Sequence, residues 1–372
     1  MKKIGIISFT EAGAQLSGRM KQALEQLYDP SASAGADLQI ALYTTKTELA
    51  QGGSGRLPNL TAVTGGLKSW CAEQFARADA LIFIGAAGIA VRTIAPFVAD
   101  KTKDPAILVA DEKGRHLISL LSGHLGGGNA LAEALAAEIG ADPVITTASD
   151  VNGRLAIDVW AQKNGLLIKD LKAAKKVAAE IVAGHAVPFF CEGEILGSLP
   201  PELVRFVSQS HIPKAEISVW VSPHLPDPDR KVLHLIPPCI VLGIGCKKQK
   251  DYETIRRRLL EVCEELQISP KAIGKMVSID LKAEEPGLLA LSRELDIPFR
   301  TASAAELETM PGEYTASSFV SGVTGVDNVC ERSAVFGLPE SERNEAKFLC
   351  RKKAAEGVTI AMTIRKWRVS FE

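Results

Sequence analysis

The sequence lacks the long apolar runs and the charge excess that mark membrane and nucleic-acid-binding proteins. Its longest apolar run, Ala80 to Val91, has twelve residues and is interrupted by two glycines, whereas a membrane-spanning helix needs about 18. About four apolar residues precede polar Ser8 at the start, too few for a signal peptide. The 43 Lys and Arg residues balance 44 Asp and Glu residues, so charge gives no general attraction for nucleic acid or anionic lipid. We therefore expect a cytoplasmic protein that binds no nucleic acid and no membrane.

Cysteine is also sparse, and nucleotide motifs are missing. The seven cysteines include no Cys-x-x-Cys pair, and their odd number does not fit a disulfide framework. We expect most of them to be reduced and buried, with no metal ligand set. The Gly85-Ala86-Ala87-Gly88 turn is not a Gly-x-Gly-x-x-Gly fingerprint, and no Gly-Lys-Ser/Thr phosphate loop occurs. A nucleotide-binding regulator is therefore the least favoured class.

The remaining composition is that of an ordinary globular chain. It has 372 residues, of which 46% are apolar and 23% charged, which suits about two or three domains. Apolar runs typical of buried strands alternate with apolar residues at helical spacing, a pattern that predicts α/β architecture. Five prolines between Pro223 and Pro238 break regular structure and indicate the main boundary. We expect two α/β domains, 1–148 and 237–372, joined by a smaller α/β middle segment and linker, 149–236.

Two local patterns are clear enough to predict elements. Apolar residues at 255, 259, 262 and 263 recur at helical spacing, which predicts a helix capped at its start by Asp251. The runs 107–110 and 117–121 flank Lys113-Gly114 and predict a hairpin.

The segment Ser122-Gly123-His124-Leu125-Gly126-Gly127-Gly128-Asn129 lies between a predicted strand and a predicted helix. Consecutive glycines let the backbone approach a ligand closely, and a helix N-terminus presents amide donors to a carboxylate or an oxyanion. His124 adds a side chain that exchanges protons near neutral pH. A tight turn with a hydrogen-bonded structural histidine explains the same pattern, so both interpretations stay open here.

A second turn from strand to helix runs from Gly85 to Arg92. In open α/β sheets, ligands gather beyond the carboxyl ends of the strands, so Arg92 and Lys101 are candidates for binding substrate carboxylates. The alternative is that Asp100 and Asp104 neutralise them in surface ion pairs.

A third candidate region consists of the glycine-rich segment 243–248 and the downstream segment 280–287. Cys246 ends a predicted strand, but nucleophilic catalysis by it is disfavoured because no partner base is identifiable. Lys282 and Glu285 are three residues apart and face one site if they begin a helix. A plain exposed ion pair explains this spacing equally well.

These motifs belong to two blocks that resemble a known family. Both blocks resemble CbiG, the cobalt-precorrin-5A hydrolase family of anaerobic cobalamin biosynthesis, in the family's order, whereas the middle segment matches only weakly. The resemblance rests on residues 85–92, 94–96, 101, 104–106, 111–112, 118–127, 129 and 143–147 in the first block, and on residues 243–246, 280–288, 325–326, 331 and 358–361 in the second.

The resemblance implies a hydrolase that acts on a carbon-carbon bond. Water opens the δ-lactone of cobalt-precorrin-5A, and the two-carbon bridge then leaves as acetaldehyde to give cobalt-precorrin-5B. The cobalt arrives with the substrate, so no cofactor and no metal ligands are implied. The partner is a small-molecule cobalt corrinoid, and other enzymes of the cobalamin pathway are further candidates. The alternative function is a non-catalytic carrier or chaperone of cobalt-corrinoid intermediates.

This chemistry needs a base for water, donors for the lactone oxyanion and cations for the peripheral carboxylates. We expect His124 to be the base and acid, with Glu285 as the alternative base. The amides of residues 126–128 are the expected donors, and three basic side chains are the expected carboxylate clamps. The residues expected to contact substrate are Gly88, Arg92, Lys101, Ser122, Gly123, Gly126, Gly127, Gly128, Asn129, Gly245, Lys282 and Gly287.

Overall fold

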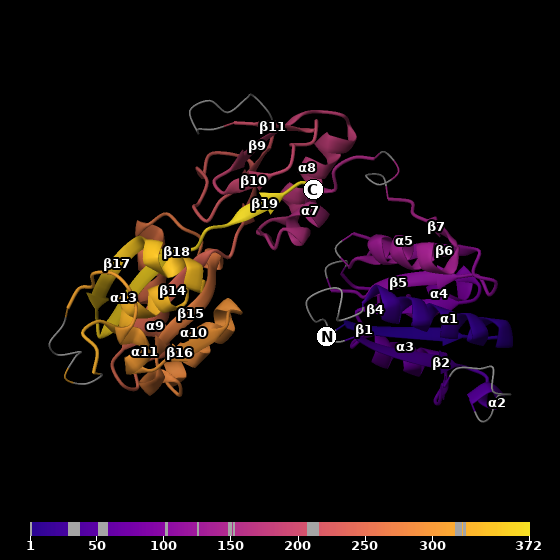
Figure 1. Ribbon diagram of the computed structural model, residues 1–372. Helices are drawn as coiled ribbons and strands as arrows, with labels where there is room; N and C mark the ends of the chain where they lie inside the picture. The colour runs from indigo at the N-terminus through magenta and orange to yellow at the C-terminus, as the bar shows by residue number, and fades with distance from the viewer. Residues whose placement is uncertain are drawn as a thin grey trace. The chain divides into compact units, whose positions relative to one another are not determined.

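The chain forms two compact α/β units, Met1–Val159 and Trp160–Glu372 (Figure 1). The predicted α/β class is therefore confirmed. The structure, a computed structural model, describes residues 2–28, 38–50, 59–100, 103–124, 126–147, 151, 153–206, 216–316, 322 and 325–372.

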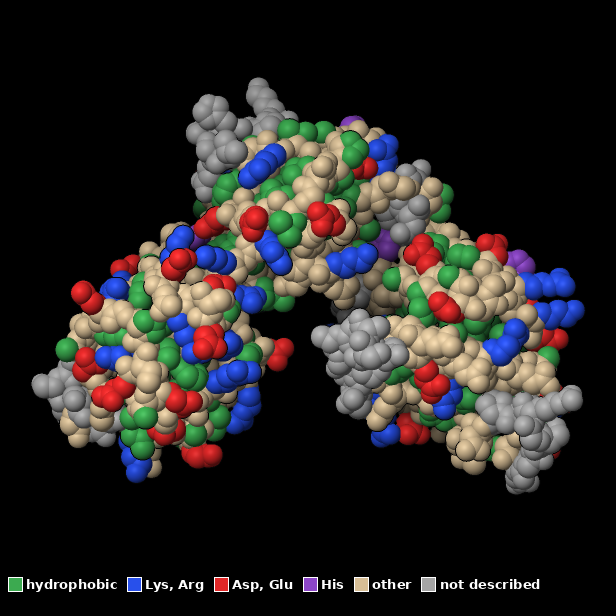
Figure 2. Space-filling model, viewed as in Figure 1, with side chains coloured by type: hydrophobic (Ala, Val, Ile, Leu, Met, Phe, Trp, Pro, Cys, Tyr) green, Lys and Arg blue, Asp and Glu red, His purple; other side chains and the backbone are tan. Residues whose placement is uncertain are grey.

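Charged side chains of both signs are interspersed on the surfaces that Figure 2 shows. Among the described residues, no helix is both long enough and apolar enough to cross a lipid bilayer. In this view the basic side chains are scattered and do not gather into one broad basic surface.

The first unit is built on one seven-stranded sheet in the order β3-β2-β1-β4-β5-β6-β7. Strands β1 to β5 are mutually parallel, β6 is antiparallel to β5, and β7 is parallel to β6. The strands are β1 (Lys2–Ser8), β2 (Leu38–Thr44), β3 (Thr61–Ala62), β4 (Ala80–Ile84), β5 (Ala106–Ala110), β6 (His116–Leu121) and β7 (Asp142–Val144). The predicted hairpin is thus confirmed as the pair β5 and β6.

Helices cover both faces of this sheet, which explains why its central strands are apolar on both sides. Helices α1 (Glu11–Leu27) and α5 (Gly128–Ile139) contribute to the core on one face, and α3 (Leu67–Phe75) and α4 (Ala87–Ile94) to the core on the other. A short helix, α2 (Thr47–Ala50), follows β2.

The direction of β6 separates the two glycine-rich turns of this unit. The 85–88 turn follows the carboxyl end of β4, where the Gly85 amide donates to the Ala110 carbonyl at 2.8 Å. Strand β6 runs back from that edge, with Leu117 beside Ala110 and Leu121 beside Ile107. The loop that starts at residue 122 therefore lies at the opposite edge, roughly 16 Å along the strands.

The first lobe of the second unit holds a five-stranded sheet in the order β11-β9-β12-β13-β8. Its strands are parallel except β8, which is antiparallel to β13. Helix α7 (Ile157–Lys163) starts at the end of the first unit, which includes Asp158, and continues into this lobe. The other elements are β8 (Leu167–Ile168), α8 (Leu171–Val182), β9 (Val187–Cys191), β11 (Leu203–Arg205), β12 (Ser218–Val221) and β13 (Val232–Ile236).

The second lobe holds another five-stranded sheet in the order β16-β15-β14-β18-β17, with β18 antiparallel to both β14 and β17. Helices α9 and α10 pack on one face and α13 on the other. The elements are β14 (Ile240–Cys246), α9 (Tyr252–Glu265), η2 (Pro270–Ala272), β15 (Ile273–Ile279), η3 (Asp280–Lys282), α10 (Pro286–Leu295), β16 (Phe299–Ala302), α11 (Ala304–Glu308), α13 (Val329–Phe336), η4 (Glu340–Glu345), β17 (Lys347–Ala355) and β18 (Val358–Ile364).

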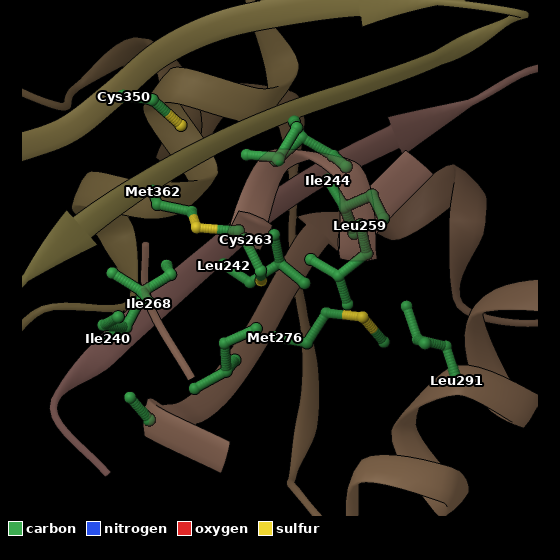
Figure 3. Close-up of a cluster of buried hydrophobic side chains, with 14 of the residues drawn as sticks. Ile240, Leu242, Ile244, Leu259, Cys263, Ile268, Met276, Leu291, Cys350 and Met362 are labelled. Atoms are coloured by element: carbon green, nitrogen blue, oxygen red, sulfur yellow. The ribbon is translucent and has the colours of Figure 1, made fainter. Parts of the chain in front are cut away.

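Helix α9 confirms both features that its sequence predicts. The Asp251 carboxylate accepts a hydrogen bond from the Thr254 amide at 2.8 Å and caps the helix. The apolar stripe is buried, and Figure 3 shows Leu259 and Cys263 in one cluster with Leu242 of β14.

The last residues of the chain pack on the first lobe of the second unit. Strand β19 (Arg368–Ser370) pairs in parallel with β10 (Glu194–Leu196). Phe371 stacks on Trp160 with ring centroids 4.6 Å apart, and the Trp160 indole N–H donates to the Ser370 carbonyl at 2.7 Å. Residues 368–371, which the sequence assigned to the 237–372 domain, thus pack on the preceding lobe.

We predict that Phe371→Ala destabilises this lobe, because the substitution removes an aromatic stack and leaves Trp160 incompletely packed. The expected loss in free energy of unfolding is about 1–3 kcal/mol, measured by urea unfolding followed by tryptophan fluorescence. Val204→Ala is the control, since Val204 is 44% exposed on the same lobe. Equal unfolding midpoints for Phe371→Ala and the control would contradict the packing role.

A histidine and a glutamate lie near the contact between the lobes of the second unit. Glu192 accepts hydrogen bonds from the Ser222 hydroxyl at 2.6 Å and from His224 Nδ1 at 2.9 Å. The Glu192 hydrogen bond raises the pKa of His224 above its ordinary 6.5. Burial alone would raise the pKa of Glu192, but the hydrogen bonds from His224 and Ser222 outweigh burial and lower it below 4.5. Next to this pair, the Leu225 amide donates to the Gln267 carbonyl at 2.7 Å.

We predict a pH window for the stability that this pair contributes. The contribution is complete above the ordinary pKa of Glu192, 4.5, and below that of His224, 6.5. It is lost as pH rises through the raised pKa of His224 and as pH falls through the lowered pKa of Glu192. The pair is partly exposed, so the difference in unfolding free energy between wild type and His224→Gln is expected to be below about 1 kcal/mol. Urea unfolding between pH 4 and pH 9 tests this, and a difference that is largest at pH 9 would contradict it.

Candidate functional site

Hydrogen bonds between its own backbone groups hold the loop between β6 and α5 in shape. Gly127 has a left-handed backbone, with φ of 77°, and is the N-cap of α5. Its amide donates to the His124 carbonyl at 2.9 Å, and the Gly128 amide donates to the Ser122 carbonyl at 3.1 Å. Two of the three amides expected to be oxyanion donors are therefore already engaged by backbone carbonyls. Among the described residues, the Gly126 amide is the one of the three that donates to no backbone carbonyl.

Close packing within the loop explains why it is rich in glycine. A Cβ on Gly126 would lie 2.5 Å from the Ser122 Cβ, so a side chain there would displace the loop. Asn129 is buried, and its amide donates to the Gly123 carbonyl at 2.9 Å while its side chain donates to the Thr147 hydroxyl at 3.0 Å. The loop is thereby tied to the chain that follows β7.

Ser122 has a strained conformation at the start of this loop. Its φ is 55°, a left-handed value that costs a non-glycine residue roughly 1–2 kcal/mol. Its hydroxyl is buried and has no hydrogen-bond partner among the described residues, His124 included. Ser122 and His124 therefore do not form a nucleophile and base pair in this structure. Backbone strain of this kind is concentrated at functional loops.

His124 lies beside a carboxylate that the sequence did not reveal. Its Nδ1 is 3.7 Å from Oδ1 of Asp158, and the two side chains are only 18% and 14% exposed. Asp158 is in the first turn of α7. No local periodicity or motif links a loop residue to an acid in a later helix, so this partner was missed.

Of the two basic clamps predicted in the first unit, the structure describes Arg92. Gly88 is in the first turn of α4, at the carboxyl edge of the sheet. Arg92 lies one turn later in α4 and is exposed. Its side chain reaches back to Gly88, since a Cβ built on Gly88 would lie 3.5 Å from a guanidinium nitrogen of Arg92. The guanidinium is therefore near this edge, and its contact with substrate stays a prediction. Lys101 falls outside the described residues. Asp104 is buried and accepts a hydrogen bond from the Ala99 amide at 3.0 Å.

Lys282 and Glu285 form a largely buried ion pair at the carboxyl end of β15, in the sheet of the second lobe. Lys282 Nζ lies 2.9 Å from Glu285 Oε2, and the side chains are 15% and 5% exposed. The interpretation as a plain exposed pair is wrong, because Glu285 is the N-cap residue of α10 and is covered there. Its other oxygen, Oε1, is buried without a hydrogen-bond partner among the described residues. Glu285 already balances the charge of Lys282, which weakens Lys282 as a carboxylate clamp.

The cysteines are unpaired and, with one exception, buried, as the sequence predicted. Cys246 is the half-buried exception. Burial raises the pKa of its thiol to about 11, outweighing the nearby Lys282 ammonium. The thiolate needed by a nucleophile is therefore scarce near neutral pH.

The two predicted glycines near this pair have close protein neighbours. A Cβ on Gly287 would lie 2.6 Å from the Ile255 side chain of α9. A Cβ on Gly245 would lie 2.8 Å from the Thr359 hydroxyl. Packing therefore accounts for both glycines without a ligand, and their contact with substrate stays a prediction. The residues that the structure describes include no cluster of three or more His, Cys, Asp or Glu side chains arranged to hold a metal ion.

Comparison with known families covers most of the chain. Family models described as Cobalamin synthesis G N-terminal, Cobalamin biosynthesis central region and Cobalamin synthesis G C-terminus match residues 69–150, 155–237 and 240–363. The resemblance carried by the two sequence blocks is thereby confirmed. The central match also extends it through the middle segment, where no specific motif was recognised.

Individual relatives agree with these matches. The cobalt-precorrin-5A hydrolase of Salmonella typhimurium is 36% identical over 310 residues, which cover 81% of this chain and 86% of the relative. The protein of the same name from Priestia megaterium is 29% identical, covering 74% and 77% respectively. A solved structure, a cobalamin biosynthesis protein G homologue from Sulfolobus solfataricus, is 22% identical, covers 97% of both chains and has a TM-score of 0.40.

Identity of 36% across most of the Salmonella protein exceeds what chance or a shared fold alone would give. Three domain models in the family's order point to the same ancestry. The chain therefore belongs to the cobalt-precorrin-5A hydrolase family.

Proposed function

We propose that this chain hydrolyses cobalt-precorrin-5A in cobalamin biosynthesis. Family membership and the names of its relatives support this substrate and a hydrolytic reaction. The finer proposal is that water opens the δ-lactone and that a carbon-carbon bond then breaks to release acetaldehyde and cobalt-precorrin-5B. Cobalt enters as part of the substrate, so the proposal includes no resident cofactor. The expected compartment is the cytoplasm.

The observation that carries the proposed mechanism is that His124, in the loop before α5, is shielded and lies beside Asp158 of α7. In the first step, His124 takes a proton from water as the water oxygen attacks the lactone carbonyl. The acyl-oxygen bond breaks, the leaving oxygen takes up a proton, and a carboxylate and an alcohol result. A histidine suits both transfers because its two protonation states are accessible near neutral pH.

The start of α5 supplies the proposed stabilisation of negative charge. The Gly126 amide is not engaged by backbone carbonyls among the described residues, and the N-terminus of the helix favours an anion. Because the Gly127 and Gly128 amides shape the turn, the proposed oxyanion donor is the Gly126 N–H alone.

In the second step, the new alcohol loses its O–H proton as the adjacent carbon-carbon bond breaks. Acetaldehyde leaves with its new C=O bond, and the electron pair of the broken bond passes to the macrocycle, which takes up a proton. Glu285 is the alternative base, because its Oε1 has no donor within the described part of the chain. Arg92 and Lys101 stay the proposed carboxylate clamps, with Lys282 weakened by its ion pair.

We predict that His124→Ala lowers the rate of acetaldehyde release by about 100-fold or more, because the base for water is lost. Acetaldehyde is measured enzymatically and the corrinoid by mass spectrometry. His185→Ala is the matched control, since His185 also lies beside a carboxylate, Glu180, but is exposed.

The same assay with Glu285→Gln separates the two candidate bases. A large loss in Glu285→Gln with a normal rate in His124→Ala would transfer the role of base to Glu285. Wild-type rates in both variants would remove the proposed mechanism. A wild-type protein that returns cobalt-precorrin-5A unchanged would instead support the carrier alternative.

A further inference from the structure

We propose that Asp158 is the positioning residue for His124, an inference that rests on the proposed role of His124 as the base. The approach of Asp158 Oδ1 to His124 Nδ1, at 3.7 Å, defines which ring nitrogen faces the acid. This separation is too long for a direct hydrogen bond and is within the range of an ion pair. Asp158 therefore acts through its negative charge, which lies opposite Nδ1.

Burial distinguishes this contact from the other histidine and carboxylate contacts of the chain. His124 and Asp158 are 18% and 14% exposed. The contacts of His116 with Asp111, His185 with Glu180 and His224 with Glu192 all involve more exposed side chains. Electrostatic interactions weaken as water access increases, so of these four contacts the one between Asp158 and His124 is the most shielded from water.

Asp158 is itself fixed in place. Its Oδ1 accepts a hydrogen bond from the Val159 amide at 3.1 Å, and it lies in the first turn of α7, where a helix favours a carboxylate. On the other side of the contact, the backbone carbonyl of His124 accepts the Gly127 amide at 2.9 Å. The backbone next to each of the two side chains is therefore held by a hydrogen bond.

This arrangement determines how the imidazole exchanges protons. A carboxylate opposite Nδ1 favours the tautomer with hydrogen on Nδ1, in which Nε2 carries the lone pair that accepts a proton from water. Once Nε2 is protonated, the same carboxylate stabilises the imidazolium. Asp158 does not touch the substrate in this scheme, and its effect is exerted on the rate of the chemical step rather than on substrate binding.

The test compares Asp158→Asn, His124→Ala and the double variant in the full-length chain. We expect Asp158→Asn to lower kcat by about 10-fold or more with little change in KM, and the double variant to be no slower than His124→Ala. Nitrogen NMR of histidine-labelled protein should show the Nδ1-H tautomer of His124 in wild type and a loss of that preference in Asp158→Asn. Glu180→Gln is the matched control, because Glu180 contacts an exposed histidine.

The outcomes separate this inference from the proposed function. If His124→Ala keeps its rate, the base assignment fails, whatever Asp158→Asn does. If His124→Ala loses its rate but Asp158→Asn keeps kcat and the wild-type tautomer, the positioning role is overturned and the base stands. Losses that multiply in the double variant would show that Asp158 acts independently of His124 and would also overturn the inference.

Discussion

The reversal of β6 against the parallel strands determines where the loop that carries the proposed base lies. Because β6 returns from the carboxyl edge, its following loop, with His124, emerges at the amino edge of the parallel strands. The carboxyl edge, where open α/β sheets usually bind ligands, is left with the 85–88 turn. The proposed base and this conventional binding edge are therefore separated by the length of a strand.

Within that loop, backbone hydrogen bonds and close contacts leave little freedom. The Ser122 carbonyl accepts the Gly128 amide, and its left-handed backbone brings its side chain against Gly126. A tightly wrapped loop of this kind restricts the orientation of the side chains it carries, which would reduce the reorganisation that the proposed base needs during reaction. The left-handed backbone of Ser122 is strained, and the packing around the loop holds it in that conformation.

Sequence periodicity predicted elements well and tertiary contacts poorly. The stripe on α9 and its cap, Asp251, followed from local spacing alone. The burial of Glu285 depends on the packing around α10. Asp158 could not be found, because its contact with His124 is tertiary. The glycine run was correctly placed before a helix, but the sequence does not show that two of its amides are used by nearby carbonyls.

The most direct test of this site asks whether substrate reaches His124. Histidine-labelled protein is observed by NMR while cobalt-precorrin-5A is added to a slow variant such as Asp158→Asn, so that the complex persists. If the loop before α5 binds the reacting lactone, the ring signals of His124 shift at substrate saturation while those of exposed His185 do not. Unchanged His124 signals at saturation would contradict a catalytic role for this loop.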